Sequence, residues 1–159
     1  MQRTRFGDMH CSIARTLHIA GEPWSPLIMR DVYVGMTRFD DIQRDLGISR
    51  KVLAERLDWL VARGMLERRA YSERPPRYDY VLTEMGQEFC GVLLTISAWG
   101  DRWTAGEAGP PALFRHKGCG EYTHAEIHCA ACGEPLRSED VEVEPGPGAD
   151  PALLASLGS

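Results

Sequence analysis

Hydrophobic positions near the middle of the chain repeat first at helical spacing and then in alternation. The first repeat predicts a helix over about residues 39–46, which Gly47 ends. The second predicts a helix that begins after Ser49, a favourable N-cap residue, and ends at Arg63 and Gly64. Two helices joined by so short a turn can pack crosswise, with the second presenting its far side to solvent. The buried side of the second helix would carry Leu53, Leu57, Leu60 and Val61.

The segment that follows these helices predicts a β-hairpin. Residues 66–71 have β-strand character, residues 72–77 predict a turn that contains Pro75 and Pro76, and residues 78–82 alternate aromatic with polar side chains. Helix, turn, helix and hairpin in this order form a winged helix-turn-helix. The predicted fold class is therefore α+β and mainly helical.

Two more helices are predicted before this region. One begins near Ser12, ends at Gly21 and carries an apolar face, and a second covers about residues 24–34. Large aromatic residues at helical spacing are usually buried, so Trp24 is expected in the core. The inward face of the first helix would consist of Ile13, Leu17 and Ala20.

A long helix is predicted after the hairpin, from about residue 84 to residue 102, with Thr83 as its N-cap. Its apolar surface is larger than a small winged domain can cover. We expect it to pair with the same helix of a second copy, because a homodimer can place two recognition helices one DNA turn apart. The apolar residues concerned are Phe89, Val92, Leu93, Ile96, Trp99 and Trp103.

Charge is unevenly distributed along the chain. The formal net charge of the 159 residues is -5. Residues 38–77 nevertheless hold ten Lys or Arg and seven Asp or Glu, a local charge of +3, whereas residues 134–159 hold one Arg and six acidic residues, a local charge of -5. Attraction to phosphate depends on local charge, so the central region is compatible with double-stranded DNA as a partner.

Hydroxyl and basic side chains lie in the first turn of the second central helix, opposite its leucines. In helix-turn-helix proteins this turn meets base edges. Arg50 could bond guanine bidentately, while Ser49 and Lys51 suit phosphate or mixed contacts. Arg74 and Arg77 flank the stiff proline turn and could reach the DNA backbone or a minor groove. The predicted DNA-binding residues are Arg38, Ser49, Arg50, Lys51, Arg56, Arg74 and Arg77. The alternative is a small helical domain with solvated arginines, but the order of these features favours DNA binding.

Cysteine usage and hydropathy together suggest a cytoplasmic protein. No apolar run approaches the roughly 20 residues that span a bilayer, and no signal-peptide pattern follows the first residues. The five cysteines are then expected as thiols, metal ligands or redox sensors. Cys11 is a redox-sensing candidate, because a helix N-terminus with His10 and Arg15 nearby favours its thiolate. The alternative is a small buried hydrophobe. Cys90, within the long apolar helix, is expected to be an inert packed thiol.

A cysteine-rich segment near the C-terminus predicts a zinc site. Nine residues separate His116-x2-Cys119 from Cys129-x2-Cys132, and both cysteine turns continue into glycine. Two such close pairs can provide four tetrahedral ligands, which leaves no open position for catalysis. The segment is too short to bury a core, and a structural zinc, worth ~10–16 kcal/mol in small fingers, would compensate.

Three alternatives to this site stay open. His124 or His128 could replace His116 as the fourth ligand, although neither precedes a cysteine at paired spacing. The segment could also be a ribbon that has lost its metal. Finally, Cys129 and Cys132 could form a dithiol pair that oxidises to a disulfide.

Composition completes the domain organisation. Residues 1–10 look flexible, residues 11–105 form the winged domain, and residues 106–112 form a linker rich in Gly and Pro. Residues 113–137 form the zinc-ribbon-like appendage. Residues 138–159 are rich in Pro, Gly, Ala and acids and are expected to be disordered. Their negative charge could compete with DNA for the basic face.

The sequence resembles the HxlR family of bacterial winged helix-turn-helix regulators over about residues 11–100. The matching segments, in order, are CSIARTL, PWSPLIMRDVYVGMTRF, ISRKVLAERLDWLVARGMLERRAY, ERPPRYDYVLTEMG and AWG. The resemblance implies homodimers that bind inverted repeats near promoters. In several members of the family a cysteine that matches Cys11 senses electrophiles or oxidants. Ser12 departs from the family, which usually has proline there.

These features predict a homodimeric, sequence-specific DNA-binding transcriptional regulator rather than an enzyme. Its control could come from oxidation of Cys11, from metal at the appendage or from a small-molecule effector that the sequence does not identify. A thiol-redox enzyme that uses Cys129 and Cys132 is the alternative from another class, and no βαβ pattern surrounds that pair. A third possibility is a zinc-ribbon module that docks a protein partner.

Overall fold

The computed structural model describes residues 6–150. The flexibility expected for residues 1–5 and the disorder expected for residues 151–159 concern positions outside this range. Contacts divide the chain into two compact units. Of the described residues, the first unit contains 6–86 and 142–150, and the second covers Gln87–Val141.

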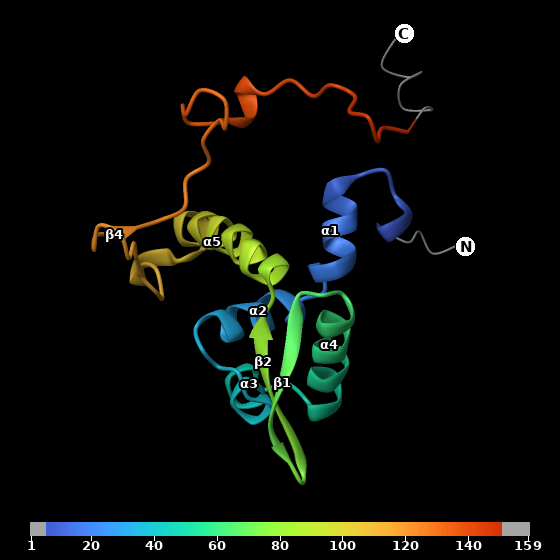
Figure 1. Cartoon of the computed structure of the whole chain (residues 1–159). Coiled ribbons are helices and arrows are strands. Elements are labelled where there is room, and N and C mark those ends of the chain that lie inside the picture. The colour runs from blue at the N-terminus through green and yellow to red at the C-terminus, as the bar shows by residue number, and fades with distance from the viewer. Residues whose placement is uncertain (1–5, 151–159) are drawn as a thin grey trace. The chain divides into compact units, whose positions relative to one another are not determined.

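The first unit has the predicted order of helices and hairpin (Figure 1). A helix-turn-helix followed by two antiparallel strands confirms the winged helix-turn-helix interpretation. The elements are η1 (Phe6–Asp8), α1 (Ser12–Ala20), α2 (Trp24–Tyr33), α3 (Phe39–Leu46), α4 (Arg50–Ala62), β1 (Leu66–Glu73) and β2 (Pro76–Leu82).

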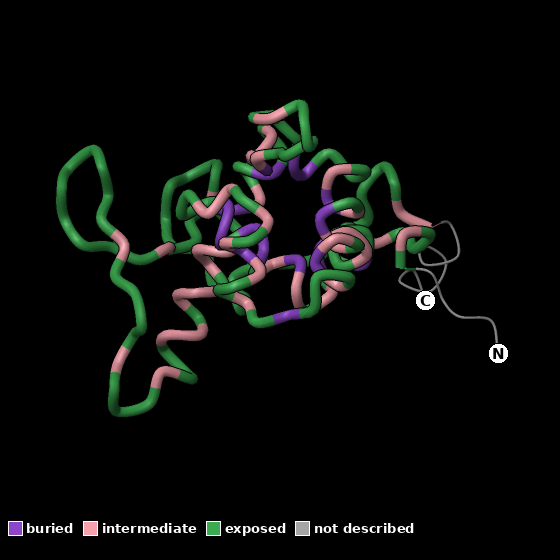
Figure 2. Tube along the Cα trace, turned by 90° about the horizontal axis from the view of Figure 1, so that it is seen from below, coloured by how far each residue is buried: buried purple, intermediate pink, exposed green. Residues whose placement is uncertain are grey.

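The core of the first unit is built where α2, α3 and α4 face the start of the hairpin (Figure 2). The predicted leucine face of α4 is confirmed, since Leu53, Leu57 and Leu60 are fully buried. Burying an aliphatic side chain of this size stabilises the fold by about 1.5–3 kcal/mol. The other apolar residues that are fully or almost fully buried here are Ile28, Met29, Ile42, Met65 and Leu66.

Local sequence signals set the angle between α3 and α4. Gly47 ends α3 in the left-handed region, with φ of 64°, which a glycine adopts without strain. Ser49 Oγ then accepts a hydrogen bond from the backbone nitrogen of Val52 at 3.2 Å and caps α4 as expected. At the other end of α4, Gly64 has a φ of 72° and turns the chain into β1.

The wing is longer than predicted. The strands were expected to end at Tyr71 and resume at Tyr78, but β1 and β2 stay paired as far as Glu73 and Pro76, with an irregularity between Ala70 and Ser72. This irregularity accommodates one extra residue in β1 without interrupting the pairing of the two strands. Proline tolerates this position because it lies at the first residue of a strand.

Two packing predictions for the N-terminal helices are wrong. Ile13 and Leu17 are 72% and 50% exposed, so only the Ala20 end of the predicted inward face is buried. Trp24 is half-buried rather than in the core. Helical spacing identifies the apolar face of a helix but does not show whether another element packs against that face. Helix α1 contacts the body chiefly at its C-terminal end, where the indole of Trp59 donates a hydrogen bond to Ile19 O at 2.9 Å.

The long helix α5 (Glu84–Thr104) begins where predicted, because Thr83 Oγ1 accepts a hydrogen bond from Gly86 N at 3.1 Å. The second unit then contains η2 (Gly106–Ala108), β3 (Phe114–Arg115), β4 (Tyr122–Thr123) and η3 (Ser138–Asp140). Over residues 6–150, no helix combines the length and apolar character that crossing a membrane requires.

Candidate nucleic-acid interface and cysteine-containing turns

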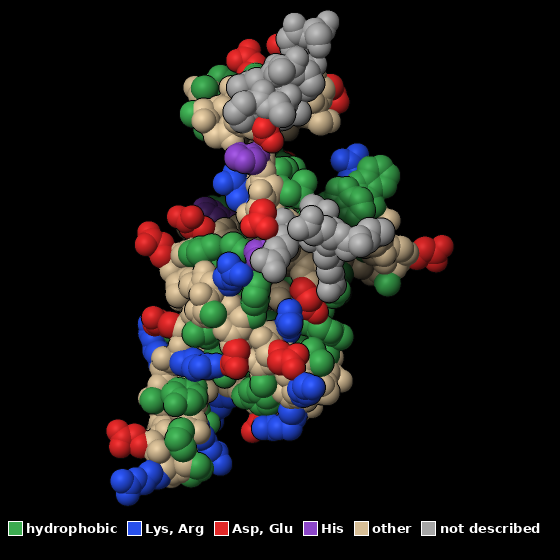
Figure 3. All heavy atoms as spheres, turned by 90° about the vertical axis from the view of Figure 1, so that its right-hand side faces the viewer, with side chains coloured by type: hydrophobic (Ala, Val, Ile, Leu, Met, Phe, Trp, Pro, Cys, Tyr) green, Lys and Arg blue, Asp and Glu red, His purple; other side chains and the backbone are tan. Residues whose placement is uncertain are grey.

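An open groove of about 570 Å³ lies between the start of α3, the start of α4 and the wing. Four arginines and two aspartates carry its charge, so the groove has an excess of positive charge. Figure 3 shows basic side chains, interspersed with acidic ones, at the lower end of the winged body. The arginines and aromatic residues that line the groove are Arg38, Arg44, Arg50, Arg77, Phe39, Tyr71, Tyr78 and Tyr80.

Arg50, in the first turn of α4, is held by two neighbours from α3. Its Nη1 lies 2.6 Å from Asp40 Oδ1, and its guanidinium carbon stands 4.7 Å from the centre of the Phe39 ring. The hydrogen bond from Arg50 holds the pKa of the Asp40 carboxyl below its ordinary value, and the charges of Arg50, Arg77 and Arg44 act in the same direction. Arg50 therefore contacts this carboxylate directly, and Arg77 and Arg44 act on it through their charge.

Arg38, the residue before α3, connects the groove with the wing. Its Nε lies 3.7 Å from Asp79 Oδ1 on β2, and its guanidinium stacks on Tyr71 at 4.8 Å from the ring centre. The backbone of the segment before α3 also pairs with β2, because Tyr80 N donates a hydrogen bond to Thr37 O at 2.8 Å. This pairing fixes the wing against α3, so side chains from both can face one ligand.

The structure brings some of the predicted DNA-binding residues together and leaves one apart. Arg38, Arg50 and Arg77 line the groove, with Ser49 and Lys51 exposed beside Arg50. Arg74 is exposed at the wing tip. Arg56 does not join them: it is 28% exposed and faces Glu22, 4.0 Å from its carboxylate.

Sequence reasoning missed Arg44, Tyr71 and Tyr78 as lining residues. Arg44 lies in the last turn of α3, and nothing in its local sequence connects it with the wing. Tyr71 and Tyr78 were missed because a tyrosine at alternating positions of a strand is as often packed in the core as it is exposed in a binding groove. Only the register of the wing against α3 distinguishes these possibilities.

A stripe of large apolar residues stays exposed along α5. Their spacing of four, three and four residues places them on one side of the helix. They are between 47% and 65% exposed, which is unusual for residues of this size. The stripe consists of Val92, Ile96, Trp99 and Trp103.

The two cysteines of the helices differ in environment. Cys11 is half-buried at the N-cap of α1, with extended backbone angles and no side-chain capping bond. Cys90 is buried on α5, and burial raises the pKa of its thiol. A raised pKa disfavours the reactive thiolate, which agrees with the prediction of an inert packed thiol.

The four predicted zinc ligands form two separate pairs. His116 Nδ1 lies 3.3 Å from Cys119 Sγ. In the other pair, the backbone N–H groups of Cys132 and Ala131, followed by the Cys132 side chain, hold the pKa of the Cys129 thiol below its ordinary value. Within residues 6–150, no three His, Cys, Asp or Glu side chains lie close enough to hold one metal ion. The zinc site therefore stays a prediction.

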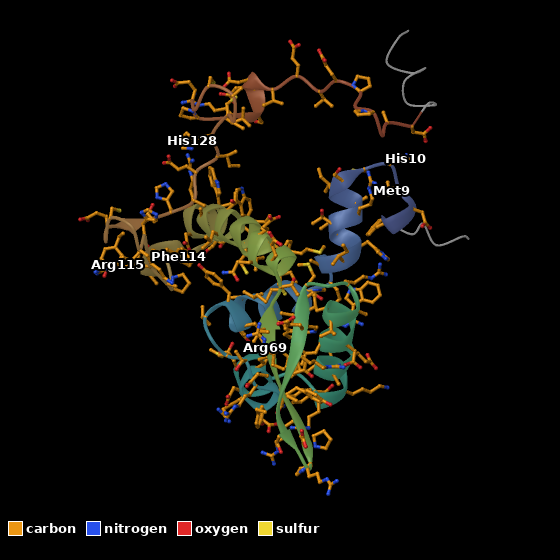
Figure 4. All side chains as sticks on the ribbon, in the orientation of Figure 1. Met9, His10, Arg69, Phe114, Arg115 and His128 are labelled. Atoms are coloured by element: carbon orange, nitrogen blue, oxygen red, sulfur yellow. The ribbon has the colours of Figure 1, made fainter. Side chains whose placement is uncertain are left out.

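The second unit also contains an open groove of about 760 Å³. It lies between the C-terminal half of α5 and residues 110–127, and Trp99, Trp103 and Tyr122 contribute rings to it. Figure 4 labels Phe114 and Arg115 at the first hairpin of this unit and His128 further along the chain.

A family model described as HxlR-like helix-turn-helix matches residues 19–108. The chain is also 39% identical over 145 residues to Rv3095 of Mycobacterium tuberculosis, named an uncharacterised HTH-type transcriptional regulator. This similarity covers 91% of the present chain and 92% of the relative.

Solved structures agree with this similarity. PA1607, a candidate transcription factor, has a TM-score of 0.79 at 29% identity and covers 90% of this chain and 100% of its own. The redox regulator HypR in its reduced form has a TM-score of 0.55 at 28% identity, over 58% of this chain and 92% of its own. The similarity to PA1607 extends beyond the winged domain, whereas the similarity to HypR covers about as many residues as that domain alone.

Proposed function

Because the chain belongs to the HxlR-like helix-turn-helix family of transcriptional regulators, we propose that it acts as a homodimer that binds specific double-stranded DNA through α4 and the wing. The arginine-lined groove at the start of α4 supports this most directly. Its guanidinium groups are the donors that suit both phosphate oxygens and the paired acceptors of guanine. Its excess of positive charge also counters the acidity of the whole chain.

Different residues of the groove would make different kinds of contact. Arg50 stands at the N-terminal turn of the recognition helix, so it would read bases, and it would exchange Asp40 for the acceptors of a guanine. Arg38, Arg77 and Lys51 would contact phosphates and set the register on the duplex. Arg74, at the wing tip, would reach the backbone or the minor groove beside the contacted major groove.

The exposed stripe of α5 supports the dimer. Val92, Ile96, Trp99 and Trp103 share one side of a helix of 21 residues and have the spacing of a helix-pairing seam. Pairing with the same face of a second copy would bury these side chains around a two-fold axis. A dimer of this kind would recognise an inverted repeat, with one recognition helix for each half.

The interface is tested by selecting binding sites from a pool of random duplexes and then measuring fluorescence anisotropy on the selected site at fixed salt. Arg50→Ala should weaken binding by about 5- to 150-fold and relax the preference for one base pair, as expected for a base contact of about 1–3 kcal/mol. Arg77→Ala should weaken binding to all sequences alike and reduce the salt slope by about 1.

Arg69→Ala is the matched control. Arg69 is an exposed wing arginine that pairs with Glu67 and does not line the groove (Figure 4). The substitution removes one positive charge from the wing, as Arg77→Ala does, and should change affinity little. Equal losses for Arg69→Ala and Arg50→Ala would reject the groove as the interface. Failure of the wild-type protein to enrich any sequence would reject specific DNA binding.

Cys11 is the proposed sensor of oxidants or electrophiles. It lies at a helix N-terminus and is partly accessible, and the similarity to the redox regulator HypR supports this role. Diamide should release the reduced wild-type protein from its selected site, while Cys11→Ser should stay bound. Cys90→Ser, which removes the buried thiol, should respond like the wild type. If diamide acts on Cys11→Ser as well, a metal at the appendage or a small ligand becomes the proposed signal.

A further inference from the structure

The turn around Cys119 has a specific set of backbone hydrogen bonds. Gly120 N donates to His116 O at 2.8 Å, and His116 N donates to Glu121 O at 2.9 Å. Gly120 has a φ of 78°, which permits the chain to fold back immediately after the cysteine. His116 Nδ1 and Cys119 Sγ both face the inside of this turn, 3.3 Å apart.

The turn around Cys132 repeats these bonds thirteen residues later. Gly133 N donates to Cys129 O at 2.8 Å, and Cys129 N donates to Glu134 O at 2.8 Å. Gly133 has a φ of 79°, within one degree of the value at the first turn. Cys129 therefore occupies the position of His116, and Cys132 occupies the position of Cys119.

The strands that flank the two turns match as well. Arg115 pairs with Tyr122 across the first turn, and His128 pairs with Pro135 across the second, so each turn is closed by the residues one before and six after its first ligand. Sequence spacing alone predicted two close pairs of ligands. The shared backbone geometry shows two equivalent turns, each of which presents two side chains on one side.

The first pair already has a separation that suits metal coordination. Two ligands of one tetrahedral zinc, with bonds of about 2.0 and 2.3 Å, lie about 3.5 Å apart, close to the distance between His116 and Cys119. The residue between them also makes room for the imidazole. A Cβ on Gly118 would lie 2.9 Å from His116 Cε1, whereas the second turn, with a smaller cysteine at this place, has Ala131.

This segment has no apolar core of its own. None of the residues from 111 to 148 is buried. In residues 114–136, no backbone hydrogen bond joins the first hairpin to the second, and the two pairs of ligands lie apart. Two ordered turns without a core or a common contact are the arrangement that a bound metal would bring together.

We infer that His116, Cys119, Cys129 and Cys132 bind one Zn²⁺ between two equivalent turns, and that this ion folds residues 113–137 into a zinc ribbon. Three thiols would each lose a proton on binding, so three protons are released and the site carries a net charge of -1. His124 and His128 both face Glu126, at 3.3 and 3.7 Å, and take no part. Four protein ligands leave no open position, so the metal is structural.

The test uses the full-length, reduced, metal-free protein and a titration with Co²⁺, which reports tetrahedral geometry and thiolate ligation by its visible and charge-transfer absorption. The wild type should bind one equivalent, and Zn²⁺ should displace it. Cys119→Ser, Cys129→Ser and Cys132→Ser should each lose part of the charge-transfer band and bind at least tenfold more weakly. His116→Ala should weaken binding but keep the thiolate band.

Matched controls identify the ligand set. Cys11→Ser and Cys90→Ser remove thiols elsewhere, and His124→Ala and His128→Ala remove the neighbouring imidazoles, so all four should bind Co²⁺ as the wild type does. Loss of Co²⁺ binding in His124→Ala or His128→Ala but not in His116→Ala would overturn the assignment of His116 as the fourth ligand. No binding by the reduced wild type would overturn the site, and a Cys129–Cys132 disulfide in the protein as isolated without metal would favour the dithiol interpretation.

A second measurement separates this inference from DNA binding. Arg115 and Lys117 are exposed in the first hairpin, so trypsin should cleave the metal-free protein there and spare the zinc-loaded protein. Because the recognition helix lies in the other unit, metal binding can be present in a chain that binds no DNA, and the reverse holds too. Equal cleavage with and without zinc would contradict folding of the ribbon by metal.

Discussion

Asp31 places a carboxylate in the core of the winged body. The residue is fully buried, Arg30 donates to its Oδ1 at 2.6 Å, and among the described residues its Oδ2 has no hydrogen-bond partner. Burial raises the pKa of this carboxyl, although the hydrogen bond from Arg30 opposes the shift. Arg30 also reaches Asp45 at 2.6 Å, so one guanidinium serves two carboxylates.

This environment predicts a pH dependence of stability. A carboxyl whose pKa is higher in the folded state stabilises the fold fully at pH values below its pKa in the unfolded chain, about 3.9. This stabilisation is lost as the pH rises through the pKa of the folded state. The wild type should therefore lose stability relative to Asp31→Asn as the pH is raised from about 4 to 7. Urea unfolding of both proteins across this range measures the difference. A wild type that gains on the variant with rising pH would contradict burial as the dominant cause.

Residue by residue, the sequence predicted part of the candidate interface. Ser49 and Arg50 were found because capping and the first turn of a helix are local properties. Arg56 was predicted as a DNA contact from its charge, but its side chain faces Glu22. Arg44 was overlooked because its place in the groove depends on the wing, which is 27 or more residues away in sequence at Tyr71. Local signals place a residue on an element, and tertiary pairing decides what it faces.

At the scale of elements, the backbone at the start of α5 closely approaches the backbone of the turn between α4 and β1. A Cβ on Gly86 would lie 2.1 Å from Met65 O and 3.2 Å from the Met29 methyl group. The first turn of α5 also carries the capping bond from Gly86 N to Thr83 Oγ1.

Gly86→Ala should destabilise the protein by about 1–3 kcal/mol, because backbone must move to admit the methyl group. Gly91→Ala is the control within the same helix. A Cβ there meets nothing within 4 Å, so alanine should instead stabilise by about 0.5–1 kcal/mol through helix propensity. Chemical denaturation of the three proteins measures both effects. Similar stability of the two variants would contradict the close approach.

Elements with strong local signals were predicted well. The end of α3 and the start of α4 agree with the sequence because Gly47 and Ser49 mark them, and Thr83 marks the start of α5. The wing was predicted too short, since residue types that favour a turn can continue a ladder when the partner strand supports them. The exposure of Ile13 and Leu17 could not be predicted, because periodicity does not reveal whether a face has a cover.

At the scale of the whole molecule, the unpaired face of α5 is the main difference between this chain and a self-sufficient domain. Ile96→Glu would put a charge at the middle of the exposed stripe, where dimer formation would have to desolvate it. The wild type should be a dimer, and the variant should be a monomer that keeps its helical circular dichroism. Light scattering after size-exclusion chromatography measures the mass of each.

Affinity for the selected DNA site should fall at least tenfold in this monomer, since each half-site would be bound separately. Gln87→Glu adds the same charge on nearly the opposite side of α5 and should leave both mass and affinity unchanged. A dimer that survives Ile96→Glu would place the interface elsewhere, for example on the exposed face of α1.

The pairing of Arg50 with Asp40 bears on how fast such a dimer finds its operator. In the proposed complex Arg50 would give up a carboxylate at 2.6 Å to reach a base, so only a sequence with suitable acceptors would compensate for the exchange. On other stretches of the genome the pair would stay closed, and phosphate contacts alone, which release readily, would hold the protein. Residence on non-target DNA would therefore be brief, and more of the chromosome could be surveyed in a given time.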